Sequence, residues 1–271
     1  MYTPRPYKDK NLNTIMKRNN KKKEFEQINN PLSEELCEFI GAMIRDGCIS
    51  SYTDKDNRSH YHISITGHIK LDKQYLTEKI VPIIISTFGK TPTIILREKY
   101  NAIILNIYSK KIFKTLTKRF GFIPGKKTKT ILIPNEILNS SENYIFATIR
   151  EIFDTDGSIF LDRRKIYKNP YPRITLRIAS EQLFTQVKTI LEKHFSVYTL
   201  QKSLNEVEYH VIVIYGEKQL EKWMELIGFS NPRHLNKINK NKPLEGFEPS
   251  ICGLQNHCYT ELSHRGIRTE K

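Results

Sequence analysis

Two aspartate-glycine pairs, Asp46-Gly47 and Asp156-Gly157, are the residues of this sequence whose type and placement best suit catalysis. Each pair follows a segment with apolar residues at helical spacing, so we expect each aspartate at the end of a helix that its glycine stops. A single pair of this kind is typical of an ordinary helix end. If two such helices pack together, however, the two carboxylates become neighbouring hard oxygen ligands that suit Mg²⁺ or Mn²⁺ over a phosphodiester.

The segments around the two pairs repeat along the chain. Asp46 precedes Asp156 by 110 residues, and Gly121 precedes Gly228 by 107. Each copy is expected to contain a helix, two strands, a helix, two strands and a helix. The expected helices include 34–46, 71–88, 110–120, 142–156 and 182–195, and the expected strands include 61–66, 93–97, 102–108, 158–163, 173–178, 197–202 and 208–215.

The repeat predicts an α+β fold of two pseudo-symmetric α-β-β-α-β-β-α halves with antiparallel sheets. We expect a flexible basic arm over 1–30, a first half over 31–129, a linker over 130–141, a second half over 142–240 and an irregular tail over 241–271. The tail contains cysteines and histidines, but their spacing matches no strong zinc pattern.

Positive charge is the first indication of a partner. Forty-four Lys and Arg residues against 29 Asp and Glu residues give a net charge of +15. A field of this size is typical of proteins that bind nucleic acid, although a lysine-rich solubilising surface is the alternative.

The apolar runs and the cysteines bear on the compartment. The longest apolar runs, such as 80–85, are too short to span a bilayer, and residues 1–23 have no apolar core of a signal peptide. Four scattered cysteines are too few for a disulfide framework in 271 residues. We therefore expect an intracellular protein with no membrane partner, in the cytoplasm or nucleoid of a prokaryote or in an organelle.

Alternating polar side chains on the expected strands point to double-stranded DNA as the partner. A twisted sheet can lie in the major groove, where arginine reads guanine and serine or threonine reads several base edges. Ordinary solvent-facing residues are the alternative reading. The candidate DNA contacts are His62, Ser64, Thr66, Arg97 and Lys99 in the first half, and Arg163, Arg164, Arg173, Thr175, Arg177 and Lys202 in the second.

The motif residues 39–47 and 149–159 resemble those of the LAGLIDADG homing endonuclease family, in its monomeric form with two motifs. The stretches 121–127 and 228–234 match each other and extend the resemblance to both halves. The resemblance implies saddle-shaped sheets and a metal-dependent double-strand break in a long DNA target, as in intron homing. It implies that Asp46 and Asp156 are catalytic and bind the metal, together with the backbone oxygens of Arg45 and Thr155.

The second motif departs from the family where Glu151 replaces a glycine that Gly41 retains in the first motif. An unpaired carboxylate in a tight helix interface would be unfavourable. We therefore expect Glu151 to pair with Arg45 or Arg150.

The family also implies a basic residue near the acids. The candidates are Lys127, its counterpart His234 with the adjacent Arg233, and His68, which could order a water molecule. The alternative is that these residues are phosphate-contacting or solvated cations.

Two other functions fit the same scaffold. One is a maturase-like protein that binds intron RNA and assists splicing without cutting. The other is a DNA-binding regulator that does not cleave. The maturase-like protein would need no catalytic metal and would tolerate the loss of either aspartate.

Overall fold

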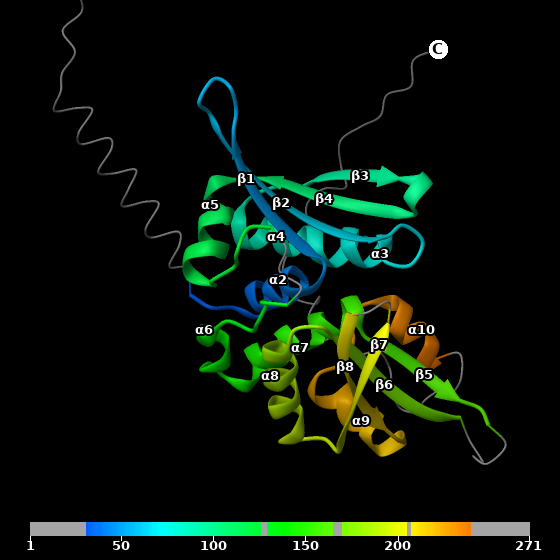
Figure 1. The fold of residues 1–271 in the computed structure, drawn as a ribbon. Helices are drawn as coiled ribbons and strands as arrows, with labels where there is room; N and C mark the ends of the chain where they lie inside the picture. Colours follow the sequence, from blue (N-terminus) through cyan, green and yellow to red (C-terminus); the bar gives the residue numbers. More distant parts are fainter. Residues whose placement is uncertain (1–30, 126–128, 165–169, 205–206, 240–271) are drawn as a thin grey trace, which may run out of the picture.

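The computed structural model describes residues 31–125, 129–164, 170–204 and 207–239. Three of the predictions lie outside the described residues: the assisting residue Lys127, the arm 1–30 and the tail 241–271. Within the described ranges, the chain forms two four-stranded antiparallel sheets with helices between and around them, so the predicted α+β class is confirmed (Figure 1).

The first half contains the first sheet, in the order β1-β2-β4-β3. Its strands are β1 (Gly47–Thr53), β2 (Ser59–His68), β3 (Thr93–Arg97) and β4 (Ala102–Tyr108). Its helices are α2 (Glu34–Arg45), α3 (Lys73–Tyr75), α4 (Val81–Phe88) and α5 (Lys110–Lys114), with π-helical turns at Leu76–Ile80 and Thr115–Arg119.

The second half repeats this strand order in the sheet β5-β6-β8-β7. Its strands are β5 (Ser158–Asp162), β6 (Tyr171–Ile178), β7 (Val197–Leu204) and β8 (Val207–Tyr215). Its helices are α7 (Glu142–Asp156), α8 (Glu181–Glu192), α9 (Glu217–Leu226) and α10 (Pro232–Asn239). The equal strand order is the structural form of the sequence repeat.

The segment between the halves is packed rather than free. It contains α6 (Asn135–Leu138), and Ile131 and Ile133 are buried. The Ile133 N–H donates to Oε1 of Gln186 at 2.8 Å, and the Ser180 hydroxyl donates to the Ile131 carbonyl at 2.8 Å. These bonds attach the segment to α8 and the residue that caps it. None of the helices that the structure describes is both long and apolar enough to cross a membrane.

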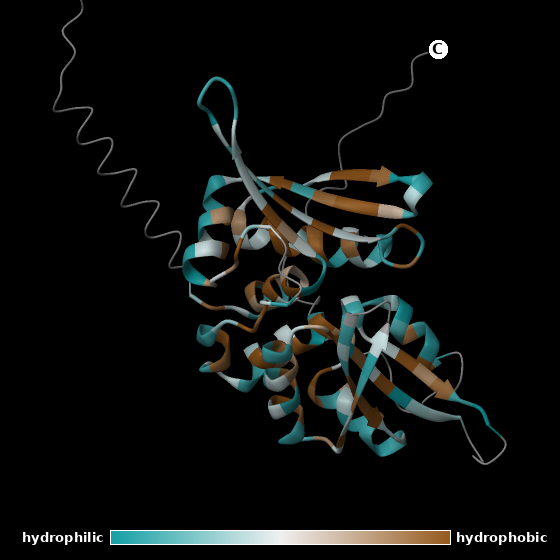
Figure 2. Ribbon diagram, in the orientation of Figure 1, coloured by the Kyte–Doolittle hydropathy of each residue, from teal (hydrophilic) through white to brown (hydrophobic). Residues whose placement is uncertain are grey.

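Helices α2 and α7 pack against each other at the centre of the molecule, where hydrophobic residues gather between the two sheets (Figure 2). Gly41 lets them approach closely. A Cβ at this position would lie 2.6 Å from the Glu151 Cβ and 2.7 Å from the Thr148 carbonyl oxygen. The Thr148 hydroxyl also bonds the Cys37 carbonyl across the interface at 3.3 Å. One glycine is therefore enough for close packing, even though the second motif has lost its own.

The Glu151 side chain is completely buried in this interface, and its predicted partners are wrong. Its Oε2 accepts a hydrogen bond from the Tyr75 hydroxyl, and its Oε1 has no hydrogen-bond partner among the described residues. Arg150 instead binds Glu38 at 2.8 Å, and Arg45 binds Asp156. Burial raises the pKa of Glu151 well above its ordinary value, so a neutral carboxyl bonded to tyrosine replaces the expected ion pair.

The two motif helices stop at the Asp-Gly pairs as predicted, and the glycines there serve a close approach of the backbone. Neither Gly47 nor Gly157 has a positive φ. A Cβ would lie 2.6 Å from the Met43 backbone at Gly47, and 2.4 Å from the Phe153 carbonyl oxygen at Gly157. These glycines let each strand start directly against the last turn of its motif helix.

Replacing Gly41 with alanine should destabilise the fold. In an open helix, this change would stabilise by about 1 kcal/mol through helix propensity. Here the added methyl group overlaps the opposite helix, so we expect a loss of about 1 to 3 kcal/mol in the free energy of unfolding. Urea denaturation measures it. Adding Glu151→Gly should recover part of the loss by removing the nearest atom, and a stabilised Gly41→Ala variant would contradict close packing.

Replacing Glu151 with glutamine should change how stability depends on pH. In the wild type, the unfolded chain ionises above its ordinary pKa of 4.5 while the folded chain stays protonated, so rising pH favours unfolding. Glutamine does not titrate. The stability of Glu151→Gln relative to wild type should therefore rise by about 1.4 kcal/mol per pH unit above that value, until the pH reaches the raised pKa of the folded state.

Denaturation series at several pH values test this prediction. Glu151→Met serves as the control because it is neutral but cannot bond Tyr75. It should show the same pH trend from a lower starting stability, and equal pH dependence of all three proteins would contradict a protonated Glu151.

Candidate functional site

Asp46 and Asp156 end the two central helices and lie near each other. Asp46 is the residue that caps α2, and Asp156 is the last residue of α7. Burial raises the pKa of Asp46 to about 7, and repulsion from Asp156 and then from Asp72 adds to this effect. The predicted pair of carboxylates is thus brought together at one end of the helix interface. Asp46 there gains and loses its proton near neutral pH.

An arginine from the first half holds the acid of the second half. The Arg45 guanidinium forms an ion pair with Asp156 and donates to the Arg177 carbonyl of β6 at 3.0 Å. The Arg45 side chain is only 14% exposed, whereas that of Asp156 is 39% exposed. Arg45 was predicted as a backbone ligand, but its side chain is what reaches the opposite acid.

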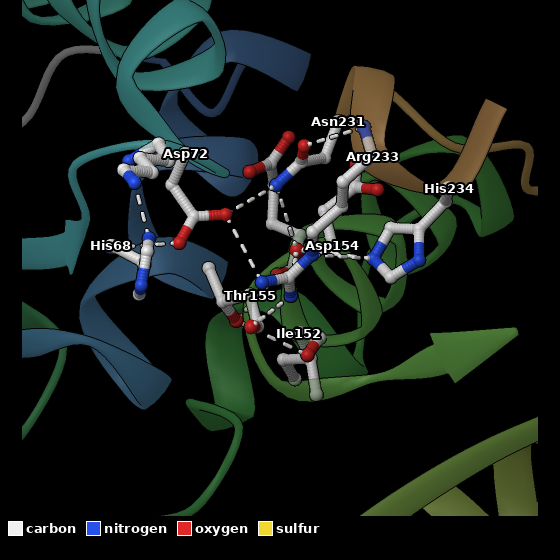
Figure 3. Close-up of polar contacts among 10 residues, drawn as sticks. His68, Asp72, Ile152, Asp154, Thr155, Asn231, Arg233 and His234 are labelled. Atoms are coloured by element: carbon white, nitrogen blue, oxygen red, sulfur yellow. Dashed lines mark hydrogen bonds and ion pairs between the residues drawn. The ribbon is translucent and has the colours of Figure 1, made fainter. Parts of the chain in front are cut away.

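Arg233 holds the C-terminal end of α7, as the close-up in Figure 3 shows. Its Nη2 donates to the Asp154 carbonyl at 2.8 Å and to the Thr155 carbonyl, and its Nη1 binds Oδ1 of Asp72 at 3.0 Å. A cation at this end of a helix is favoured by the helix dipole. The Thr155 carbonyl, predicted as a metal ligand, is therefore engaged by Arg233.

Asp72 and Asn231 complete this network, and the sequence did not single them out. The buried amide of Asn231 donates to Asp72 at 3.0 Å and to the Asp154 carbonyl at 3.2 Å. The other oxygen of Asp72 accepts the His68 N–H at 2.8 Å. Asp72 is 159 residues from Asn231, and the local patterns around the two residues do not indicate that they meet.

Asp154 is a second buried acid beside the predicted one. One carboxylate oxygen accepts a hydrogen bond from the Ser230 N–H at 2.7 Å, while the other has no partner in the part of the chain that the structure describes. Burial raises the pKa of this carboxyl above its ordinary value. The backbone carbonyl of Asp154, on α7, also contacts the ring of His234, on α10.

The histidine candidates differ in their access to the site. His234 is fully buried, and its Nε2 lies 3.3 Å from the Asp154 carbonyl. Burial and the neighbouring Arg233 lower the pKa of His234 to about 4, so it is neutral at physiological pH. His68 is exposed and adjoins Asp72 through its backbone. Of the two histidines, His68 is the one that a bound molecule could reach.

The strand residues predicted to contact DNA lie on the sheet faces turned away from the core. In the first sheet, His62, Ser64 and Thr66 alternate with the buried Ile63 and Ile65. Arg97 lies on the same face, through its pairing with Ala102. Lys99 is exposed in the turn Glu98–Tyr100 that follows β3.

The outward face of the second sheet is more cationic. In β6, Arg173, Thr175 and Arg177 alternate with the buried Ile174 and Leu176. The register of β7 and β8 puts Lys202 on this face, and the exposed Arg163 and Arg164 follow β5. Arg173 lies over the Tyr215 ring and Arg177 over the Tyr209 ring, at 5.3 and 5.6 Å from the ring centroids.

The acids at the helix ends fit a divalent cation that shares its ligands with a substrate. The described residues include no group of three or more His, Cys, Asp or Glu side chains arranged to hold a metal ion. Mg²⁺ commonly uses one or two carboxylates and takes its other ligands from water and substrate phosphates. A cation between Asp46 and Asp156 would also relieve the repulsion that adds to the effect of burial on the Asp46 pKa.

Comparison with known sequences gives a family match in the second half. The sequence model of a family described as "LAGLIDADG-like domain" matches residues 143–228. The replication factor C small subunit of Methanocaldococcus jannaschii is 30% identical over 213 residues, which are 76% of this chain and 10% of that protein. A DNA polymerase of Thermococcus hydrothermalis is 25% identical over 223 residues, which are 78% of this chain and 12% of that protein. The chain therefore spans about a tenth of the length of these curated relatives.

Solved structures share this fold over 72% of the chain. The homing endonuclease I-DmoI in complex with DNA and Mn matches with a TM-score of 0.52 and 16% identity, over 72% of this chain and 96% of that one. Mesophilic variants of I-DmoI match with the same TM-score and identity, over 72% of this chain and 88% of theirs. The resemblance to the LAGLIDADG family is thus confirmed: residues 143–228 match the model of the LAGLIDADG-like domain, and the chain has the fold of the LAGLIDADG homing endonuclease I-DmoI.

Proposed function

We propose that this protein is a homing endonuclease that makes a divalent-metal-dependent double-strand break in a long DNA target. The observation that carries the proposal is the meeting of two helix-end carboxylates, Asp46 from one half and Asp156 from the other. The outward faces of the two sheets supply the polar and cationic side chains for DNA. Solved I-DmoI structures with DNA and Mn, and with DNA and Ca, support DNA as partner and a divalent cation as cofactor.

In this proposal, Asp46 and Asp156 hold Mg²⁺ or Mn²⁺, with the backbone oxygens of Arg45 and Thr155 as further ligands. When bound, the cation supplies activation of water and stabilisation of the leaving oxygen. Asp46 must first lose its proton, and Asp156 must share or lose its ion pair with Arg45. Arg233 must likewise share the Thr155 carbonyl.

The basic residues near the acids have different proposed roles. Arg233 keeps positive charge at the end of α7, where negative charge accumulates on the reacting phosphate. His68 is the accessible histidine for ordering water, whereas His234 supports the backbone under Arg233. Lys127 remains a proposed assisting residue by its position in the repeat.

The two halves are proposed as one working unit in one chain. Residues 31–129 and 142–240 would form the halves, joined by 130–141, with 1–30 and 241–271 as the arm and the tail. Because one chain supplies both carboxylates, a monomer suffices. A host-DNA target would put the protein in a prokaryotic nucleoid or an organelle.

A second candidate function is DNA or intron-RNA binding without cleavage. The observation in its favour is that the centre already contains two cations of its own, the guanidinium groups of Arg45 and Arg233. They neutralise the acids without a metal. In a retired nuclease, these contacts would persist in the complex with nucleic acid.

Removing either acid should abolish the double-strand break. We expect the wild type to convert a plasmid with the uninterrupted host site into linear product only with Mg²⁺ or Mn²⁺. Asp46→Asn and Asp156→Asn should yield no linear product, because each removes one of the two carboxylates proposed to hold the cation. Both variants should still bind the site, as measured by gel shift.

Glu221→Gln is a matched control, because Glu221 is an exposed acid on α9, outside the site. It should cut like the wild type. Binding without nicking by the wild type under every metal tried would favour the non-cleaving function.

Cation affinity should depend on pH through Asp46. Below its pKa of about 7, the cation must displace a proton, so affinity for Mn²⁺ should rise by up to about tenfold per pH unit. Above this pKa, the rise should level off. Mn²⁺ titration of the protein–DNA complex, followed by electron paramagnetic resonance, measures this. Asp46→Asn should remove the pH-dependent part, and an unchanged slope in that variant would assign the proton to another group.

A further inference from the structure

A buried acid lies among the arginines of the second sheet's outward face. Asp162, at the end of β5, pairs with Tyr171, and the preceding outward residue Phe160 pairs with Arg173. Asp162 and Arg173 are therefore diagonal neighbours on one face. The Asp162 carboxylate forms an ion pair with Arg173. Its Oδ1 and Oδ2 also accept hydrogen bonds from the Nε–H of Arg164, at 3.0 and 2.9 Å. One acid thus holds two of the arginines predicted to contact DNA.

The charge of Asp162 is unexpected on a surface that would approach phosphates. Its side chain is only 5% exposed, and hydrogen bonds from Arg164 lower its pKa, so it stays ionised. A negative charge here weakens the overall attraction for DNA. Its effect on the arginines must therefore be geometric.

Arg173 is restricted on two sides. One Nη binds Asp162, and the guanidinium lies over the ring of Tyr215, at 5.3 Å from its centroid. The side chain remains 26% exposed. A guanidinium carries five N–H donors in a planar fork, so donors remain for a ligand after one nitrogen binds Asp162.

We propose that Asp162 is a positioning residue that orients Arg173 to read a guanine in the half-site under the second sheet. Arginine recognises O6 and N7 of guanine through two parallel hydrogen bonds, which demand a fixed guanidinium plane. Holding that plane before binding lowers the conformational entropy lost on contact. The inference rests on the DNA binding in the proposed function but not on cleavage.

Arg177 provides an internal comparison. It lies two residues along the same strand on the same face and stacks over Tyr209. Among the described residues, no acid forms an ion pair with its side chain. Arg177 therefore offers the same charge and a similar ring contact without the orienting carboxylate.

The test is selection of bound sequences from a random DNA library without divalent metal, followed by affinity measurements on single-base variants. We expect the wild type to prefer guanine at one position and Arg173→Ala to lose this preference. Asp162→Asn should lose it at the same position by about tenfold or more in discrimination. Because an acid is removed, its affinity for random DNA at low salt should be equal or higher. Arg177→Ala should keep the preference for guanine at that position.

Two outcomes would overturn the proposal. Asp162→Asn with wild-type discrimination at the Arg173-dependent guanine would overturn the proposal. So would a loss spread over all positions together with a lowered melting temperature, which indicates general unfolding. If the wild type cuts DNA but selects no guanine that depends on Arg173, only this inference fails. If it selects that guanine but never cuts, the proposed endonuclease activity fails and this inference stands.

Discussion

The close contact between α2 and α7 at Gly41 is the constraint on which the candidate site depends. Because Gly41 has no Cβ, the Thr148 carbonyl and the Glu151 Cβ of the other helix can approach its backbone. Each helix then ends in an acid, and the approach brings the two acids into one electrostatic environment. The raised pKa of Asp46 is a direct result, since burial and the nearby Asp156 both disfavour its charged form. A wider interface would let water separate these charges and would weaken the demand for a cation.

Charge balance across the interface is reciprocal. Arg45 of the first half binds Asp156 of the second, and Arg233 of the second half binds Asp72 of the first. Each half therefore neutralises an acid that the other contributes, at the same end of the helix pair. The same guanidinium groups are the donors that an incoming phosphate would attract. In the proposed function, these two arginines would link phosphate binding to release of the carboxylates, and DNA docking would make Asp156 available.

The sequence alone predicted the architecture but not the side-chain contacts between distant segments. Alternation in β2 and β6 predicted which residues face outward, because a strand has only two faces. The Asp-Gly pairs predicted where the motif helices end. The partner of Glu151 was mispredicted because helical periodicity tells how a residue faces but not which distant side chain meets it. Tyr75 is 76 residues from Glu151, and no local sequence pattern predicts that its helix packs against Glu151. Asp72 and Asn231 were missed for the same reason.

The two sheets present different chemistry on equivalent faces. The centre of the first face offers the hydrogen-bonding side chains of His62, Ser64 and Thr66, with Arg97 at its edge, whereas the second offers arginines stacked on tyrosines. A pseudo-symmetric backbone therefore supports an asymmetric surface. For a DNA ligand, the second sheet would supply most of the salt-dependent attraction, while the first would depend on hydrogen bonds to base edges. In the proposed endonuclease, sequence divergence between the repeated halves would let one chain recognise a target that is not a palindrome, while the central helices keep their shared geometry.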